Sequence, residues 1–317
     1  MRYQAVRLEH KHLEEAARLV SRRYAKLHRD IPILPTQYSE IDTLLPLLTD
    51  ILTAGLGVAL LDGASLAGFA AGYLLDEFIG RPAAFSPEWA NAALPEDTTQ
   101  VYETLYAHIA PQWLDHGYPT HLVSLLSNDR VGIEGLHWLG FGKVAADGIR
   151  SLEPVPELGT QWDIRKAKPV PDDIQAVMVL DTALNQHLAA SPTFFPHGEG
   201  RDWDYYANRV NDPANAFWLA FMDDQPIASI AFGPASQEAC TIIVDRGTTS
   251  ISSAFTLPDM RRTGIATRLL NIGLEWARAQ GYQRCAVDFE AANPLAAHYW
   301  LRNFHLVCVT LMRSLIS

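Results

Sequence analysis

The stretch Ile251–Leu306 reads ISSAFTLPDMRRTGIATRLLNIGLEWARAQGYQRCAVDFEAANPLAAHYWLRNFHL, and its patterning predicts a strand, a helix and a second strand in that order. The first strand spans Ile251–Leu257, because Pro258 cannot continue a ladder of hydrogen bonds. Apolar residues then recur at helical spacing in a run that ends before Gly281: Ile265, Leu269, Ile272 and Trp276. The second strand, Cys285–Phe289, follows that glycine. A tight turn therefore joins the first strand to the helix.

This turn, Arg261–Ala266 (RRTGIA), has the composition of an anion-binding site. The first turn of a helix leaves about four amide groups without intrahelical acceptors, and the helix dipole makes that end positive. Gly264 allows a close approach to the backbone, and Arg261 and Arg262 add positive charge, so a diphosphate fits here. A plain turn with solvated arginines explains the hexamer equally well. Neither a Walker loop nor the G-x-G-x-x-G dinucleotide fingerprint is present.

Together with the residues that follow the second strand, the turn resembles the signature of the GNAT superfamily of N-acetyltransferases. Arg261-x-x-Gly264-x-Ala266 is similar to the R/Q-x-x-G-x-G/A motif of that family. Asn293, followed by Pro294 and then by an aromatic pair, resembles its second conserved block. The resemblance implies an α/β (α+β) fold with a mixed, mostly antiparallel sheet flanked by helices. It also implies transfer of an acetyl group from acetyl-CoA to an amine, which attacks the thioester directly.

The resemblance assigns the acetyl-CoA site residue by residue. Backbone groups of the first strand match those that hydrogen-bond the pantetheine arm: Ala254, Phe255 and Thr256. The turn and the start of the helix match the segment that holds the pyrophosphate: Arg262, Thr263, Gly264, Ile265, Ala266 and Thr267. Asn293 matches the asparagine that contacts the cofactor arm. Acetyl-CoA is thus the expected acyl-donor substrate, and no metal is expected.

The catalytic residues match the family less well. In the family a carboxylate removes the proton of the amine, often through water, and a tyrosine protonates the departing thiolate. By position Asp288 matches the base, and Glu290 lies two residues later on the same face of the strand. The tyrosine position holds Trp300, whereas Tyr299 lies one residue earlier, about 100° around a helix. We expect either a local adjustment that makes Tyr299 the donor or an ordinary packed aromatic residue.

The chain also repeats itself. Gly57–Gly72 (GVALLDGASLAGFAAG) aligns without gaps on Trp218–Gly233 (WLAFMDDQPIASIAFG), and each segment is typical of a β-hairpin. A helix that ends at glycine and leads into an apolar strand also recurs, around Gly117 and around Gly281. We therefore expect two domains, a degenerate GNAT-like copy at 1–155 and an acetyl-CoA-binding GNAT domain at 156–317, joined by the proline-rich stretch Glu153–Gly159.

The first copy lacks the anion-binding turn. Its corresponding segment, Ala93–Val101 (ALPEDTTQV), contains neither glycine nor arginine. We expect this copy to pack against the second or to shape its acceptor site.

Composition narrows the remaining choices. A length of 317 residues suits two domains, and the net charge of −11 argues against a sequence-independent nucleic-acid binder. The 3 cysteines are too few for a disulfide framework, which favours a cytoplasmic protein, and no stretch is typical of a membrane span.

The sequence leaves three functions open. The first is an N-acetyltransferase with a small-molecule amine or a protein N-terminus as acceptor. The second is a non-catalytic acyl-CoA-binding or interaction protein, because the tyrosine is displaced from its position. The third is an inactive structural relative.

Overall fold

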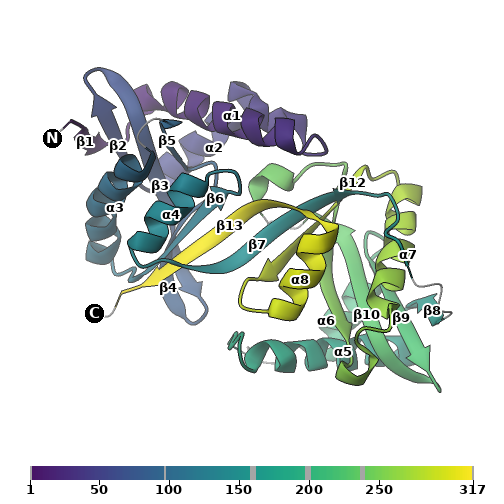
Figure 1. Cartoon of the computed structure of the whole chain (residues 1–317). Helices are drawn as coiled ribbons and strands as arrows, with labels where there is room; N and C mark the ends of the chain where they lie inside the picture. Colours follow the sequence, from purple (N-terminus) through teal and green to yellow (C-terminus); the bar gives the residue numbers. More distant parts are fainter. Residues whose placement is uncertain (1, 96–97, 158–161, 197–200, 236–239, 316–317) are drawn as a thin grey trace. The chain divides into compact units, whose positions relative to one another are not determined.

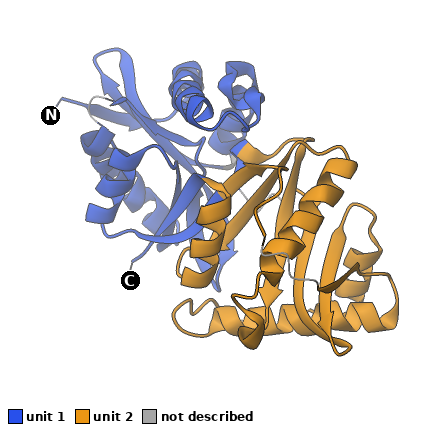
Figure 2. Cartoon of the chain, turned by 45° about the vertical axis from the view of Figure 1, so that its right-hand side comes forward, with its two compact units in different colours: residues 1–147, 240–242, 306–317 blue, residues 148–239, 243–305 orange. Residues whose placement is uncertain are grey.

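A computed structural model describes residues 2–95, 98–157, 162–196, 201–235 and 240–315 of the chain. The chain divides into two compact units (Figure 2, blue and orange). Unit 1 comprises Met1–Asp147, Cys240–Ile242 and Leu306–Ser317, and unit 2 comprises Gly148–Ala239 and Ile243–His305. These units are defined by packing. The expected boundary between duplicated copies, 1–155 and 156–317, stays a prediction.

Unit 1 is a sheet flanked by helices, as labelled in Figure 1. Its helices are α1 (Leu13–Asp30), α2 (Ile41–Ala54), α3 (Thr98–Asp115) and α4 (Arg130–Trp138), with short 3₁₀ turns at His10–His12 and Thr36–Ser39. Its strands include β1 (Gln4–Arg7), β2 (Gly55–Asp62), β3 (Ser65–Phe78), β4 (Arg81–Ser86), β5 (Asn91–Ala93) and β6 (Thr120–Leu126). The strand order is β1-β2-β3-β4-β6, and β5 pairs with β3.

One edge of β6 pairs with β4, and its other edge pairs with a strand from much later in the chain. This strand is β13 (His305–Ser314), and its residues Cys308–Ser314 pair antiparallel with Thr120–Leu126. Within unit 1 all neighbouring strands on this path are antiparallel except β4 and β6, which run parallel. The sheet is therefore mixed and mostly antiparallel, as the resemblance implies.

Unit 2 repeats this arrangement. Its helices are α5 (Pro171–Ala189), α6 (Trp203–Asn211), α7 (Ile265–Ala279) and α8 (Pro294–Asn303). Its strands are β8 (Asp163–Lys166), β9 (Ala216–Met222), β10 (Gln225–Pro234), β11 (Thr248–Thr256), β12 (Arg284–Glu290) and residues 148–151 of β7 (Gly142–Ser151). The order is β7-β12-β11-β10-β9-β8, in which β11 and β12 are parallel and β8 to β11 antiparallel.

The repeated sequence segments occupy equivalent hairpins. Gly57–Gly72 lies in the hairpin β2–β3, and Trp218–Gly233 lies in the hairpin β9–β10. In each unit the second hairpin strand pairs with a strand that starts a parallel pair, β4–β6 or β11–β12. The internal repeat of the sequence is thus a repeat of topology.

Two glycines set the ends of α7. Gly264 precedes the helix with φ +90°, and Gly281 follows it with φ +87°. Both values lie in the left-handed region, which glycine adopts without the steric penalty of a Cβ. The amide of Tyr282 then donates to the carbonyl of Ala277, which closes the last turn. The predicted helix is therefore confirmed at both ends.

Candidate functional site

The site of unit 2 lies where two parallel strands part. β11 and β12 are paired only between Thr248–Ile251 and Arg284–Val287, although β11 continues to Thr256 and β12 to Glu290. The other edge of β11 stays paired with β10 as far as Thr256. Past Ile251, one edge of β11 therefore lacks a paired strand among the described residues, and its peptide groups on that side are available to a ligand.

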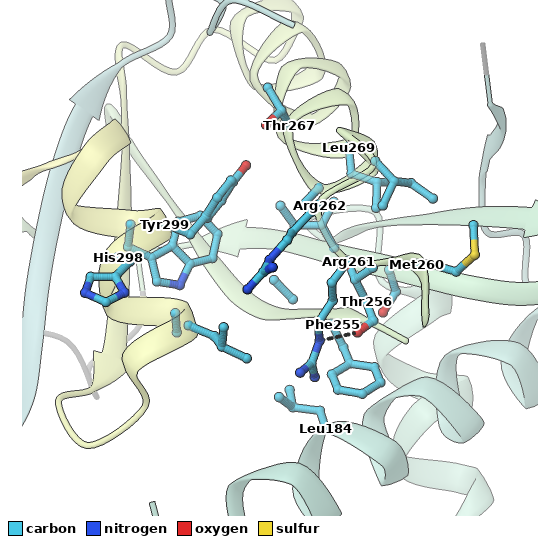
Figure 3. A pocket seen from close by; sticks show the side chains of 18 of the residues that line it. Leu184, Phe255, Thr256, Met260, Arg261, Arg262, Thr267, Leu269, His298 and Tyr299 are labelled. Atoms are coloured by element: carbon cyan, nitrogen blue, oxygen red, sulfur yellow. Dashed lines mark hydrogen bonds between the residues drawn. The ribbon is translucent and has the colours of Figure 1, made fainter. Parts of the chain in front are cut away.

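A cavity of about 620 Å³ occupies this gap. Its walls come from α5, β10, β11, the turn before α7, α7 and α8, and Figure 3 shows the side chains. Most of the expected acetyl-CoA contacts line it, namely Ala254, Phe255, Thr256, Arg262, Gly264, Ile265, Ala266, Thr267 and Asn293. Thr263 is not part of the wall; its hydroxyl donates to the carbonyl oxygen of Met260 at 2.7 Å. The volume falls in the range of ordinary small-molecule pockets.

Amide groups without an acceptor in the helix belong to residues at one end of this cavity. The first backbone hydrogen bond of α7 runs from the amide of Arg268 to the carbonyl of Gly264, at 3.0 Å. The amides of Ile265, Ala266 and Thr267 precede it and have no acceptor within the helix. Arg262 has φ +66°, so the turn includes two left-handed residues, a geometry that gathers amide groups around an anion. This end suits a phosphate group.

The two arginines of the turn play different parts. The Nε of Arg261 donates to the carbonyl oxygen of Thr256 at 3.2 Å, and its guanidinium lies 5.8 Å from the ring centroid of Phe255. Arg261 is thereby held against β11. Arg262 is exposed, and its side chain extends into the cavity in Figure 3. Arg262 is therefore free to contact a ligand, whereas Arg261 forms part of the wall.

Asn293 begins α8. Its Oδ1 accepts from the amide of Ala296 at 3.3 Å, and its side chain is buried. An asparagine at this position caps the helix because its oxygen replaces a missing intrahelical acceptor. The same side chain lines the cavity, so the cap also places an amide group at the ligand site.

Tyr299 lies on α8 with its hydroxyl directed toward the first turn of α7, where Thr267 is located (Figure 3). The hydroxyl oxygen is buried and has no hydrogen-bond partner among the described residues. Burial raises the pKa of Tyr299 to about 12, while Thr267 and Arg150 act against this rise. The ring packs edge-on against Trp300, with centroids 4.8 Å apart. An unpartnered buried hydroxyl is costly, which is typical of a group kept for a ligand.

The two expected carboxylates lie elsewhere on β12. Asp288 is exposed and Glu290 half-buried, and neither belongs to the wall of the cavity. Their role as a base stays a prediction.

Two residues of the cavity wall belong to no sequence motif: Leu184 and His187, which are one helical turn apart on α5. Only the position of α5 over β10 and β11 brings them to the site, so no local pattern could have found them.

The equivalent region of unit 1 is filled. Asp129 caps α4 as Asn293 caps α8, by accepting from the amide of Gly132 at 3.0 Å. Asp129 also pairs with Arg23, and Tyr102 donates to Oδ1 of Asn91 at 3.0 Å. The space left here is about 20 Å³, room for little more than a water molecule. Residues 96–97 of the segment that lacks the anion-binding motif lie outside the described residues.

None of the helices in the described part of the chain is long and apolar enough to cross a bilayer.

Comparison with known proteins identifies the domain. Residues 183–305 match the model of the acetyltransferase (GNAT) family, and this segment contains every residue that lines the cavity. No curated protein matches the chain. Solved structures show the fold instead. A GCN5-related N-acetyltransferase from Sphaerobacter thermophilus is 14% identical, with a TM-score of 0.60 over 99% of this chain and 96% of that one.

Two further structures are similar over nearly the whole chain. One is a tandem GNAT protein from the clavulanic acid biosynthesis pathway, 12% identical, with a TM-score of 0.50 and 98% of each chain covered. The other is a glucosamine N-acetyltransferase region in a fungal multi-domain beta-N-acetylglucosaminidase, 11% identical, with a TM-score of 0.57 over 98% of this chain and 38% of that one. Residues 183–305 therefore match the acetyltransferase (GNAT) family, and the whole chain has the fold of a tandem GNAT protein.

Proposed function

We propose that unit 2 binds acetyl-CoA and transfers its acetyl group to an amine, carried by a small molecule or by a protein N-terminus, in the cytoplasm. One observation supports this most directly. The amide-rich turn at Gly264 and the unpartnered hydroxyl of Tyr299 open on the same cavity. An anion site and a proton donor at one cavity are what thioester aminolysis by a CoA ester requires.

The acyl donor would be held by the backbone. The amides of Ile265, Ala266 and Thr267 suit the diphosphate, since they have no acceptor of their own, and Arg262 adds charge beside them. The free edge of β11 at Ala254–Thr256 suits the amide groups of the pantetheine arm, which would pair with it as a strand does.

The chemistry needs two proton transfers. A neutral amine attacks the thioester carbon and the C–N bond forms, the nitrogen loses a proton to a base or to water, and the C–S bond then breaks. The departing thiolate takes a proton, and Tyr299 is the wall residue suited to give it, because its phenol is protonated at neutral pH and its residue lines the cavity. An amide N–H on the free edge of β11 is suited to stabilise the oxyanion of the tetrahedral intermediate.

A second function has an observation of its own. No carboxylate lines the cavity among the described residues, so the base expected from the family is missing from the wall. This favours a protein that binds acyl-CoA without catalysis.

Two measurements separate the candidates. Calorimetry with coenzyme A should show one site per chain, because the equivalent space in unit 1 is filled. Release of free thiol from acetyl-CoA is then followed with glucosamine, lysine, spermidine, tryptamine and a short peptide with a free N-terminus. Binding with thiol release supports the transferase, and binding without release supports the second function. No binding would exclude both.

A further inference from the structure

We propose that His187 is the general base of the site, the group that takes the proton from the attacking amine. This inference rests on the proposed acetyl transfer and assigns a role that neither the family match nor the sequence motifs assign. It also places the catalytic base on α5 rather than on β12, where the sequence predicts Asp288 or Glu290.

The first observation in favour of His187 is its position in the cavity wall. It lines the cavity together with Leu184 and Phe255, and its ring centroid lies 6.2 Å from that of Phe255. Phe255 belongs to the free edge of β11, along which the pantetheine arm would lie. His187 therefore lies in the wall beside the strand along which the thioester would be held.

The second observation is that few residues of the cavity wall can accept a proton. Its titratable groups, among the described residues, are His187, Arg261, Arg262, His298, Tyr299 and Arg302. Arginine cannot accept a proton at neutral pH, and Tyr299 still holds its own. Only the two imidazoles remain. His298 is exposed on α8, and Figure 3 shows it apart from Phe255 and Arg261.

The surroundings keep His187 ready to accept. Burial lowers the pKa of His187, and the positive charge of Arg261 lowers it further, so both favour the neutral ring. The side chain of Asn293 acts in the opposite direction, as an oxygen that accepts from one ring N–H does. The second ring nitrogen then has a free lone pair for the proton of the amine.

Two acidic groups of α5 are already engaged. Asp181, on the same helix, accepts from the hydroxyl of Tyr206 on α6 at 2.7 Å and from that of Ser253 on β11 at 3.2 Å. Asp173, at the first turn of α5, pairs with Arg165 of β8. Among the described residues, Arg261 is thus the charged group that acts on His187.

The protons balance. One nitrogen of His187 takes a proton from the amine as the C–N bond forms. The C–S bond breaks, and the thiolate takes the hydroxyl proton of Tyr299. Imidazolium and tyrosinate then return to their resting states by exchange with solvent, which leaves an amide and coenzyme A.

The first test needs no acceptor. The C2 proton of His187, identified by its loss in His187→Gln, is followed by NMR against pH, with and without coenzyme A. We expect a pKa below 6.5, the ordinary value for histidine, in both states. A value above 7 would overturn the proposal, since the ring would then be charged at the working pH.

The second test follows thiol release from acetyl-CoA, with the best amine of the panel or, if none reacts, with water as acceptor. His187→Gln should lower kcat by about 100-fold or more and remove the decline of the rate at acid pH, with unchanged affinity for coenzyme A. His187→Ala should recover activity when imidazole is added, which a merely structural role would not produce.

Four variants serve as comparisons. Asp288→Asn, Glu290→Gln and His298→Gln should keep the acid decline, and loss of the decline in any of them while His187→Gln keeps it would overturn the proposal. His305→Gln changes an exposed imidazole on β13 and should leave the rate unchanged. Failure of the proposed function is recognisable separately, because wild-type protein would then release no thiol; the NMR titration still decides the state of His187.

Discussion

Phe232 on β10 lies so close to Gly273 on α7 that a Cβ at Gly273 would be 1.9 Å from Cε2 of the ring. Phe232 is completely buried, and Gly273 sits in the middle of the helix that starts at the anion-binding turn. The contact therefore fixes how near α7 lies to the sheet, and with it the position of the turn at the cavity.

Replacing Gly273 with alanine should destabilise unit 2. Alanine favours a helix over glycine by about 1 kcal/mol, but a clash with a buried ring costs about 1–3 kcal/mol or more. We expect a net loss, measured as a lower midpoint in urea unfolding. Gly135→Ala on α4 is the matched control, since its Cβ would meet its nearest atom at 3.4 Å. Equal midpoints for both variants would contradict the packing argument.

Gly264→Ala should weaken the binding of coenzyme A. At φ +90° a Cβ costs about 1–2 kcal/mol, and relief of that strain would turn the amides away from the diphosphate. Calorimetry should show an affinity at least tenfold lower. Gly281→Ala carries the same backbone strain, at φ +87° and with open space around it, at the other end of α7. It should cost similar stability and leave the affinity intact.

Tyr299→Phe should separate catalysis from stability. Removal of the proton donor should reduce kcat about 100-fold and leave affinity for coenzyme A unchanged. Because the lost hydroxyl has no hydrogen-bond partner among the residues that the structure describes, the thermal midpoint should stay equal or rise. Unchanged kcat would make Tyr299 a packing residue, and a lower midpoint would mean that its hydroxyl is satisfied.

Glu88 should make the stability of unit 1 depend on pH. It is buried, and burial raises the pKa of its carboxyl from 4.5 to about 7, although the amide of Ile242 donates to it at 3.0 Å and opposes the rise. The folded state thus holds a proton that the unfolded chain has already lost, so stability falls as pH rises from about 4.5 to about 7.

Glu88→Gln should reduce the dependence of the free energy of unfolding on pH, because the amide keeps an oxygen acceptor and does not ionise. Urea unfolding at several pH values between 4.5 and 7.5 gives the slope of the free energy of unfolding against pH. The exposed Glu275→Gln should keep the wild-type slope. An identical slope for the two variants would remove Glu88 as its source.

Local chemistry made much of unit 2 predictable. The spacing of Ile265, Leu269 and Trp276 predicted α7, and Gly264 and Gly281 marked its ends, because a left-handed backbone is a local property. The hairpins followed from alternation and turns for the same reason. His187 has no such marker. It reaches the cavity only through the packing of α5 on β11, and the sequence carries no local sign of that contact.

The division into compact units shows the same limit. The prolines at Glu153–Gly159 suggested a linker between two consecutive domains, which is a local inference from composition. The boundary at 155 stays a prediction, whereas the compact units, which are defined by packing, divide two strands: residues 148–151 of β7 belong to unit 2, and residues 306–314 of β13 belong to unit 1. Pairing between strands so distant in the sequence depends on the whole chain.

The pairing of β13 with β6 has a consequence for folding during synthesis. Thr310 on β13 hydrogen-bonds Ser124 on β6, 186 residues earlier, so a ribosome must finish the intervening stretch before the second edge of β6 is paired. Until then the nascent N-terminal half carries an open strand edge, a template for association with other chains. A gene truncated after residue 155 would leave that edge exposed for good, whereas supplying 306–314 as a separate peptide should cover it.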